Sequence, residues 1–180
     1  MRKYLMTLAA VLCCAMTTAM FTACSSDKDD DDKPINEPTY VAAVMDSRFT
    51  VSADMLNKFD LFVEYYDENG KVQKEQLTQT EWKKSVKANL PAKLGARLKA
   101  QLKSGIETEG VRFDITYGHY YKCYAVSSKG FTGLGATSEE NMSGGVIGSE
   151  VYDWVKKIGD DMVSYLYSFD SEGTPTVASW

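Results

Sequence analysis

The sequence predicts a mainly β domain, an antiparallel β-sandwich or sheet with one C-terminal amphipathic helix packed on it; an α+β fold is the alternative. Three observations lead to this prediction. Long stretches alternate apolar and polar residues with a period of two, an Asn-Gly pair separates two such stretches, and near the end the period becomes helical. Because a period of two puts every second side chain on one face, the pattern is typical of half-buried strands.

The first predicted strands form a hairpin. The alternation at 61–65 ends at Asn69-Gly70, and both residues of this pair tolerate a positive φ angle. Residues 71–78 are therefore expected to return antiparallel to the first run.

The other predicted strands differ in the strength of their pattern. Residues 94–102 and 111–126 alternate apolar and polar side chains over most of their length. Residues 41–51 give a weaker pattern, and 81–90 fits a helix nearly as well as a strand.

The pattern changes twice after the last of these strands. Residues 127–148 contain six glycines among Ser and Thr, which predicts a flexible loop. From Val151 to Leu166 the apolar residues recur at helical spacing, with Asp and Lys opposite. One amphipathic helix is therefore expected to close a single domain that spans residues 39–180.

The first 23 residues have the layout of a bacterial secretory signal. Arg2 and Lys3 precede an apolar stretch that is too short to cross a membrane as a helix of about 20 residues. The following Phe-Thr-Ala-Cys, at 21–24, resembles the lipobox of bacterial lipoproteins, although that family usually has Leu where Phe21 stands. The resemblance implies cleavage before Cys24 and attachment of a diacylglycerol to its sulfur, with palmitate as a typical acyl chain.

Residues 24–38 are expected to form a lipidated, acidic and flexible tether, because like charges and two prolines disfavour regular structure. Lys28-Asp29-Asp30 follows Cys24 closely and resembles the export signal of Bacteroidetes-type surface lipoproteins. That resemblance implies an outer-membrane protein that faces the cell exterior. A plain charged spacer is the alternative, and calcium binding is disfavoured because a loop glycine and a bidentate Glu are missing.

Charge and cysteine content limit the partners. Without residues 1–23 the chain keeps 157 residues, with 18 basic against 25 acidic side chains and a net charge of −7. Such a charge disfavours nucleic acid, and it leaves covalent lipid at Cys24 as the expected link to the membrane. Cys123 is then the one remaining cysteine, and it is expected to be a small buried hydrophobe. Neither a metal site nor a cofactor is expected.

Four aromatic residues are candidates for ligand binding. Phe62, Tyr66, Tyr120 and Tyr124 have the parity that turns them away from the predicted core. Aromatic rings on a flat sheet would suit the stacking of sugar rings. The alternative is that the C-terminal helix covers them, since large apolar patches are usually buried.

These observations predict a lipid-anchored, non-catalytic module on the cell surface that binds a glycan or a protein or serves as an accessory subunit. The sequence has no enzyme signature, because His119 and Asp114 lie on opposite faces of one predicted strand and cannot orient each other. The alternative function is a small surface hydrolase of glycans, whose carboxylates converge only in the fold.

Overall fold

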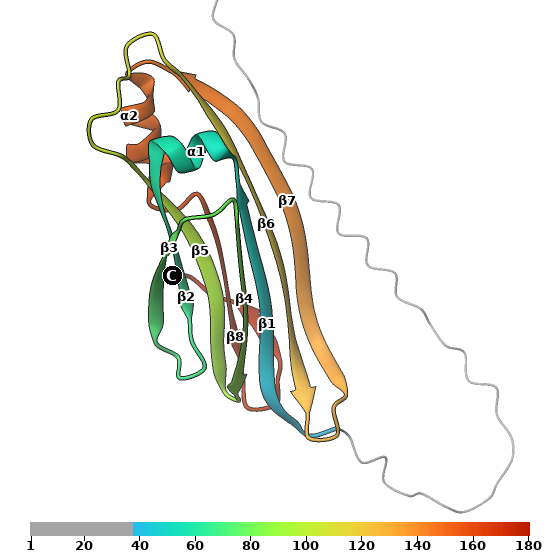
Figure 1. The fold of residues 1–180 in the computed structure, drawn as a ribbon. Coiled ribbons are helices and arrows are strands. Elements are labelled where there is room, and N and C mark those ends of the chain that lie inside the picture. The colour runs from blue at the N-terminus through green and yellow to red at the C-terminus, as the bar shows by residue number, and fades with distance from the viewer. Residues whose placement is uncertain (1–37) are drawn as a thin grey trace, which may run out of the picture. The chain divides into compact units, whose positions relative to one another are not determined.

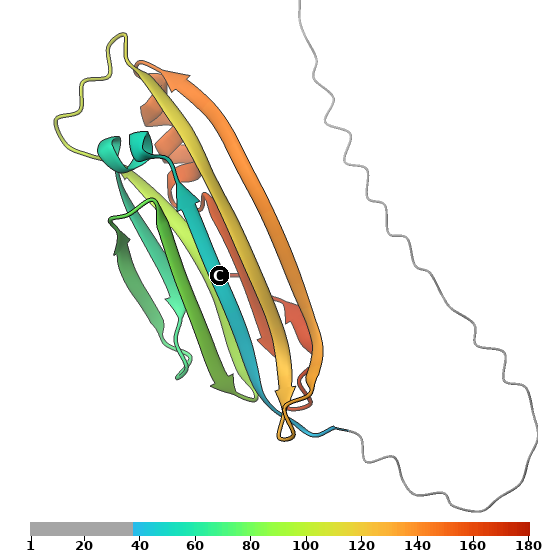
Figure 2. The same ribbon diagram turned by 45° about the vertical axis from the view of Figure 1, so that its right-hand side comes forward.

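The computed structural model describes residues 38–180, which belong to one compact unit. In this part of the chain, strands form two antiparallel sheets that pack face to face (Figures 1 and 2). Sheet A consists, in spatial order, of β4 (Glu81–Asn89), β1 (Tyr40–Val51), β6 (Arg112–Ser127) and β7 (Thr132–Ile147). Sheet B consists of β3 (Val72–Leu77), β2 (Phe59–Tyr66), β5 (Ala92–Leu102), β8 (Val163–Phe169) and β9 (Pro175–Val177). The predicted fold class is confirmed, and the uncertain stretch 81–90 is a strand.

The core lies between the two sheets, because alternate residues of each strand face the opposite sheet. Met45 and Phe49 of β1, Leu94 and Leu98 of β5 and Phe113 of β6 are at most 2% exposed. Burying one such side chain contributes about 1.5–3 kcal/mol to stability. The same alternation leaves the even-numbered residues of β1, β2 and β6 on the outer faces of the sandwich.

The hairpin between β2 and β3 has the turn that the sequence predicts. Gly70 has a φ angle of 72°, which a residue with a side chain rarely adopts. The carboxylate of Asp67 accepts hydrogen bonds from the backbone N–H groups of Asn69 at 2.9 Å and Lys71 at 2.8 Å. These bonds fix the register in which Tyr66 lies opposite Val72.

Short helices lie at one end of the sandwich (Figure 1). They are α1 (Ala53–Lys58), α2 (Glu150–Trp154) and η1 (Val155–Gly159), the last a turn of π-helix that continues α2. The C-terminal helix is present but shorter than expected, because the chain enters β8 at Val163. Tyr165 and Leu166 are both buried although they are neighbours in a strand, since Tyr165 faces the core and Leu166 lies under the segment that contains Ala178. Because these two neighbouring residues are both buried, the apolar positions in this stretch match the spacing of a helix although the segment is a strand.

The prediction of a flexible loop at 127–148 is wrong over most of its length. These residues form β7, which pairs with β6 along its whole length (Figure 2). A Cβ atom on Gly135 would overlap the carbonyl oxygen of Cys123 on the neighbouring strand. This glycine therefore permits close packing of the two strands, which sequence composition does not distinguish from flexibility.

Candidate ligand-binding face

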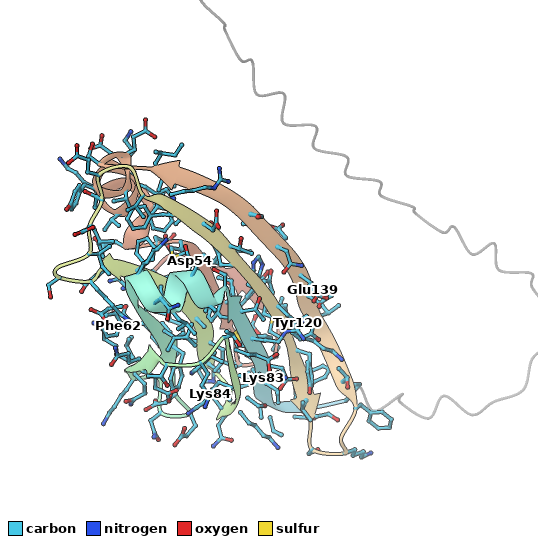
Figure 3. All side chains as sticks on the ribbon, turned by 45° about the horizontal axis from the view of Figure 1, so that its top comes forward. Asp54, Phe62, Lys83, Lys84, Tyr120 and Glu139 are labelled. Atoms are coloured by element: carbon cyan, nitrogen blue, oxygen red, sulfur yellow. The ribbon has the colours of Figure 1, made fainter. Side chains whose placement is uncertain are left out.

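The four candidate aromatic residues lie on the outer faces of the sandwich, two on each sheet. Tyr120 and Tyr124 of β6 lie on sheet A, and Phe62 and Tyr66 of β2 lie on sheet B, all of them half-buried. Figure 3 shows Tyr120 and Phe62 on different sheets. The helix formed by α2 and η1 packs at the end of the sandwich against β7 and β5. Side chains outside this helix pack against the four rings, and these side chains differ between the two sheets.

On sheet A, strand register places four side chains in one row across the outer face. Lys83 of β4 is opposite Arg48 of β1, Arg48 is opposite Tyr120, and Tyr120 is opposite Glu139 of β7. Arg48 Nη2 donates a hydrogen bond to Glu139 Oε1 at 2.6 Å, and Arg48 Cζ lies 5.4 Å from the centre of the Tyr120 ring. Because β6 lies between β1 and β7, this ion pair spans the strand that carries Tyr120.

A groove of about 330 Å³ lies beside this row. It is lined by Asp46, Ser47, Arg48, Lys83, Lys84, Ser85 and Tyr120. The lining residues include three cations and one carboxylate, and two of the cations have partners outside the groove, Lys84 with Glu75 at 3.0 Å and Lys83 with Glu81 at 2.9 Å. The groove offers an aromatic ring, hydroxyl-binding groups and positive charge together on β4, β1 and β6. Of these residues only Tyr120 was a candidate from sequence.

Nearby rows on both sides of Tyr120 add to this surface. Gly118 precedes Tyr120 on the same face, and a Cβ atom there would overlap Asn141 Oδ1 and lie 2.8 Å from Thr50 Oγ1. The absence of a side chain at Gly118 thus leaves room for two polar side chains next to the ring. Tyr124 lies opposite Gly135, and the ammonium of Lys122 is 5.1 Å from the centre of the Tyr124 ring.

On sheet B, residues near the end of the sequence cover part of the outer face. The Trp180 ring lies 5.2 Å from the Tyr66 ring, centre to centre, and the Arg97 guanidinium lies 4.6 Å from the centre of the Trp180 ring. Lys74 lies 4.1 Å from the centre of the Phe62 ring. A second groove of about 450 Å³ is bounded by Trp180 itself and by Arg97. The aromatic pair of sheet B is therefore packed against the chain's own side chains.

Two partly buried carboxylates are held by basic partners. Burial tends to raise the pKa of Glu64, but the hydrogen bond from Arg97 and the nearby charges outweigh it, and the pKa is lowered. Arg97 Nη2 lies 2.6 Å from Glu64 Oε2. Lys99 Nζ lies 3.7 Å from Glu64 Oε1. Glu64 therefore stays ionised at neutral pH and is a poor proton donor.

Glu75 of β3 connects the two sheets at one edge of the sandwich. Its carboxylate accepts hydrogen bonds from Tyr65 Oη at 2.6 Å, Trp82 Nε1 at 2.7 Å and Lys84 Nζ at 3.0 Å. Burial opposes ionisation, but these three donors and the charge of Lys84 lower the pKa of Glu75 to about 2. The group is thus a structural acceptor that is fully ionised at neutral pH.

His119 and Cys123 face the interior from β6. The His119 ring lies 6.1 Å from the Tyr121 ring and 6.0 Å from the Tyr165 ring, centre to centre. Burial lowers the pKa of His119, although the charge of Glu140 opposes this, so the imidazole is neutral at neutral pH. Burial also raises the pKa of Cys123, which is 1% exposed. Within residues 38–180, His, Cys, Asp and Glu side chains nowhere form a group that could hold a metal ion.

The remaining sequence-based sites are the lipid attachment at Cys24 and the export signal at Lys28, Asp29 and Asp30. All four residues lie outside the described part of the chain. Among the residues that the structure describes, no helix is both long and apolar enough to cross a membrane. Comparison of the chain with family models, with curated proteins and with solved structures finds no match.

Proposed function

We propose that this protein is a lipid-anchored, non-catalytic module of the outer membrane that faces the cell exterior and binds a glycan through the outer face of sheet A. The anchor and the location are inferred from Cys24 and from Lys28-Asp29-Asp30. The observation that carries the binding function is the groove beside Tyr120, in which an aromatic ring lies among polar and charged side chains. This combination matches a sugar, which has an apolar C–H face and a rim of hydroxyls.

The carboxylates support a binding role over hydrolysis. A glycoside hydrolase needs one carboxylic acid with a raised pKa near a second carboxylate. In this chain the pKa values of Glu64 and Glu75 are lowered, and both carboxylates are engaged with basic partners. In the groove itself, Asp46 is the one carboxylate among the lining residues.

Binding is tested on a glycan array with the full chain purified in detergent. The variant Tyr120→Ala should bind at least about tenfold more weakly, a loss of about 1.4 kcal/mol that is typical of a central aromatic contact. Phe62→Ala is the matched control, because it removes an aromatic ring from the outer face of the other sheet. Equal effects of the two variants would contradict the assignment to sheet A. Release of new reducing ends from a bound glycan would instead favour the hydrolase alternative.

The anchor and the location are tested in cells. Cys24→Ala should take up no labelled palmitate, and incorporation by this variant would refute lipidation at Cys24. Replacing residues 27–32 with Ser and Ala should protect the protein from a protease that cannot cross the outer membrane, while lipidation continues. Equal digestion of this variant and the unaltered protein would indicate that the acidic run is only a spacer and would contradict the export signal.

A further inference from the structure

The ion pair between Arg48 and Glu139 lies where a ligand would have to bind. Arg48 lines the groove, its guanidinium lies near the Tyr120 ring, and the partner carboxylate comes from β7 on the other side of β6. Glu139 is not among the residues that line the groove. A carboxylate is therefore bound at the edge of the groove, and the protein itself supplies it.

We propose that Glu139 holds the position of a ligand carboxylate, and that the groove binds an acidic polysaccharide built from uronic acids. This inference rests on the proposed glycan-binding function and specifies its ligand. On binding, the uronate carboxylate replaces that of Glu139 on Arg48, and Glu139 turns to solvent. The sugar ring then lies over β1, between Tyr120 and Lys83.

The groups around the groove are suited to such a ligand. Arginine presents a planar fork of N–H donors that matches the two oxygens of a carboxylate. Lys83 is opposite Arg48 in the strand register and provides a second cation on the same face, where it forms an exposed ion pair with Glu81 at 2.9 Å. Asp46 and Ser85 are opposite each other in the next row, where they can bind the hydroxyls of the ring.

The exchange of carboxylates is feasible because the existing ion pair is weak. The side chains of Arg48 and Glu139 are 35% and 56% exposed, so water screens their attraction and both side chains remain free to move. A uronate that also stacks on Tyr120 and contacts Lys83 gains interactions that Glu139 does not make. The ligand therefore replaces the exposed contact of Glu139 with several, and the ion pair between Lys83 and Glu81 is exposed and screened by water in the same way.

The test measures binding of polygalacturonate and of alginate, each before and after chemical reduction of its carboxylates to alcohols, to the full chain in detergent. Glu139→Gln should bind the acidic polymers about two- to fivefold more tightly, because an exposed competing ion pair is removed. Arg48→Gln should bind them at least about tenfold more weakly, because the charge-assisted hydrogen bonds are lost. The carboxyl-reduced polymers should bind weakly to every variant.

Asp114→Asn is the matched control for Glu139→Gln. Asp114 is on the outer face of the same sheet, forms an ion pair with Arg112 at 2.8 Å and is 60% exposed, close to the value for Glu139. Both changes raise the net charge by one, so a general charge effect would alter the two variants equally. Equal affinities of these two variants would overturn the inference.

Two other outcomes separate this inference from the proposed function. Equally tight binding of the reduced and the acidic polymers, lost in Tyr120→Ala, would overturn the acidic ligand but leave glycan binding through sheet A intact. If neither acidic polymer binds but neutral glycans on the array bind in a Tyr120-dependent way, the acidic ligand is overturned and glycan binding through sheet A remains. Absence of Tyr120-dependent binding to any glycan would overturn both.

Discussion

The outer faces of the two sheets carry the same sequence feature and differ in what covers it. Each has two aromatic residues four positions apart on one strand, Tyr120 and Tyr124 on sheet A and Phe62 and Tyr66 on sheet B. On sheet B, Trp180 packs against Tyr66 and lies under the guanidinium of Arg97. On sheet A, the group near Tyr120 is the guanidinium of an exposed ion pair.

This difference separates a structural surface from the proposed binding surface. Trp180 buries apolar area, and a ligand would have to expose that area again in order to reach Tyr66. The ion pair on sheet A buries little, so exchanging its carboxylate for that of a ligand costs little. Under the proposed function, outward-facing aromatic residues therefore contribute to stability on sheet B and to ligand recognition on sheet A.

The largest expected effect tests the structural role of sheet B. Trp180→Ala should lower the free energy of unfolding by about 2–3 kcal/mol, less than for a fully buried aromatic because Trp180 is half-buried. Trp180→Phe is the control, since it keeps a ring beside Tyr66 and removes an indole N–H that is buried without a hydrogen-bond partner in the described structure. Urea unfolding of the full chain measures both. A loss in Trp180→Ala no greater than in Trp180→Phe would contradict the structural role.

An intermediate effect is expected where the two sheets are joined. Glu75 has a folded-state pKa of about 2 against an ordinary value of 4.5, so its contribution is complete above pH 4.5 and is lost as the pH falls toward 2. Because its side chain is 39% exposed, we expect this contribution to be only about 1–2 kcal/mol. Unfolding free energies between pH 6 and 3 should fall less steeply in Glu75→Gln. Parallel curves of unfolding free energy against pH for the two proteins would show that ionisation of Glu75 does not contribute to stability.

The smallest expected effect is on the stability of sheet A. Arg48→Gln should change the free energy of unfolding by less than about 1 kcal/mol, because the ion pair with Glu139 is exposed and screened by salt. Urea unfolding at low and high salt checks this. A loss as large as that in Trp180→Ala would mean that the ion pair is part of the fold and is not available to a ligand.

The sequence predicts which way a side chain points better than which side chains meet. The period of two indicates that Tyr120 and Phe62 face away from the core, and the structure places both on outer faces. Arg48 and Glu139 are 91 residues apart and come together because β6 lies between their strands, which the alternation does not reveal. Glu139 also falls in the stretch that glycine content assigns to a loop. The ion pair beside the groove was missed for these two reasons.

The packing of the segment around Ala178 and Trp180 on sheet B could not be predicted from the sequence, for a related reason. Tyr165 and Leu166 fit a helical period because one faces the core and the other is covered by the segment around Ala178. The segment around Ala178 has no alternation or helical period that would predict where it packs. Its position depends on tertiary contacts such as that between Trp180 and Tyr66.

The most direct test of the account is to locate a bound acidic sugar by NMR. Backbone amide resonances of the full chain in detergent micelles are followed during titration with a short oligogalacturonate. Shifts should cluster at residues 46–48 and 83–85 and at Tyr120, which line the groove on sheet A, while residues 60–66 on sheet B remain unchanged. Shifts centred on sheet B, or shifts on both sheets without a cluster at the groove, would contradict the assignment of binding to the outer face of sheet A.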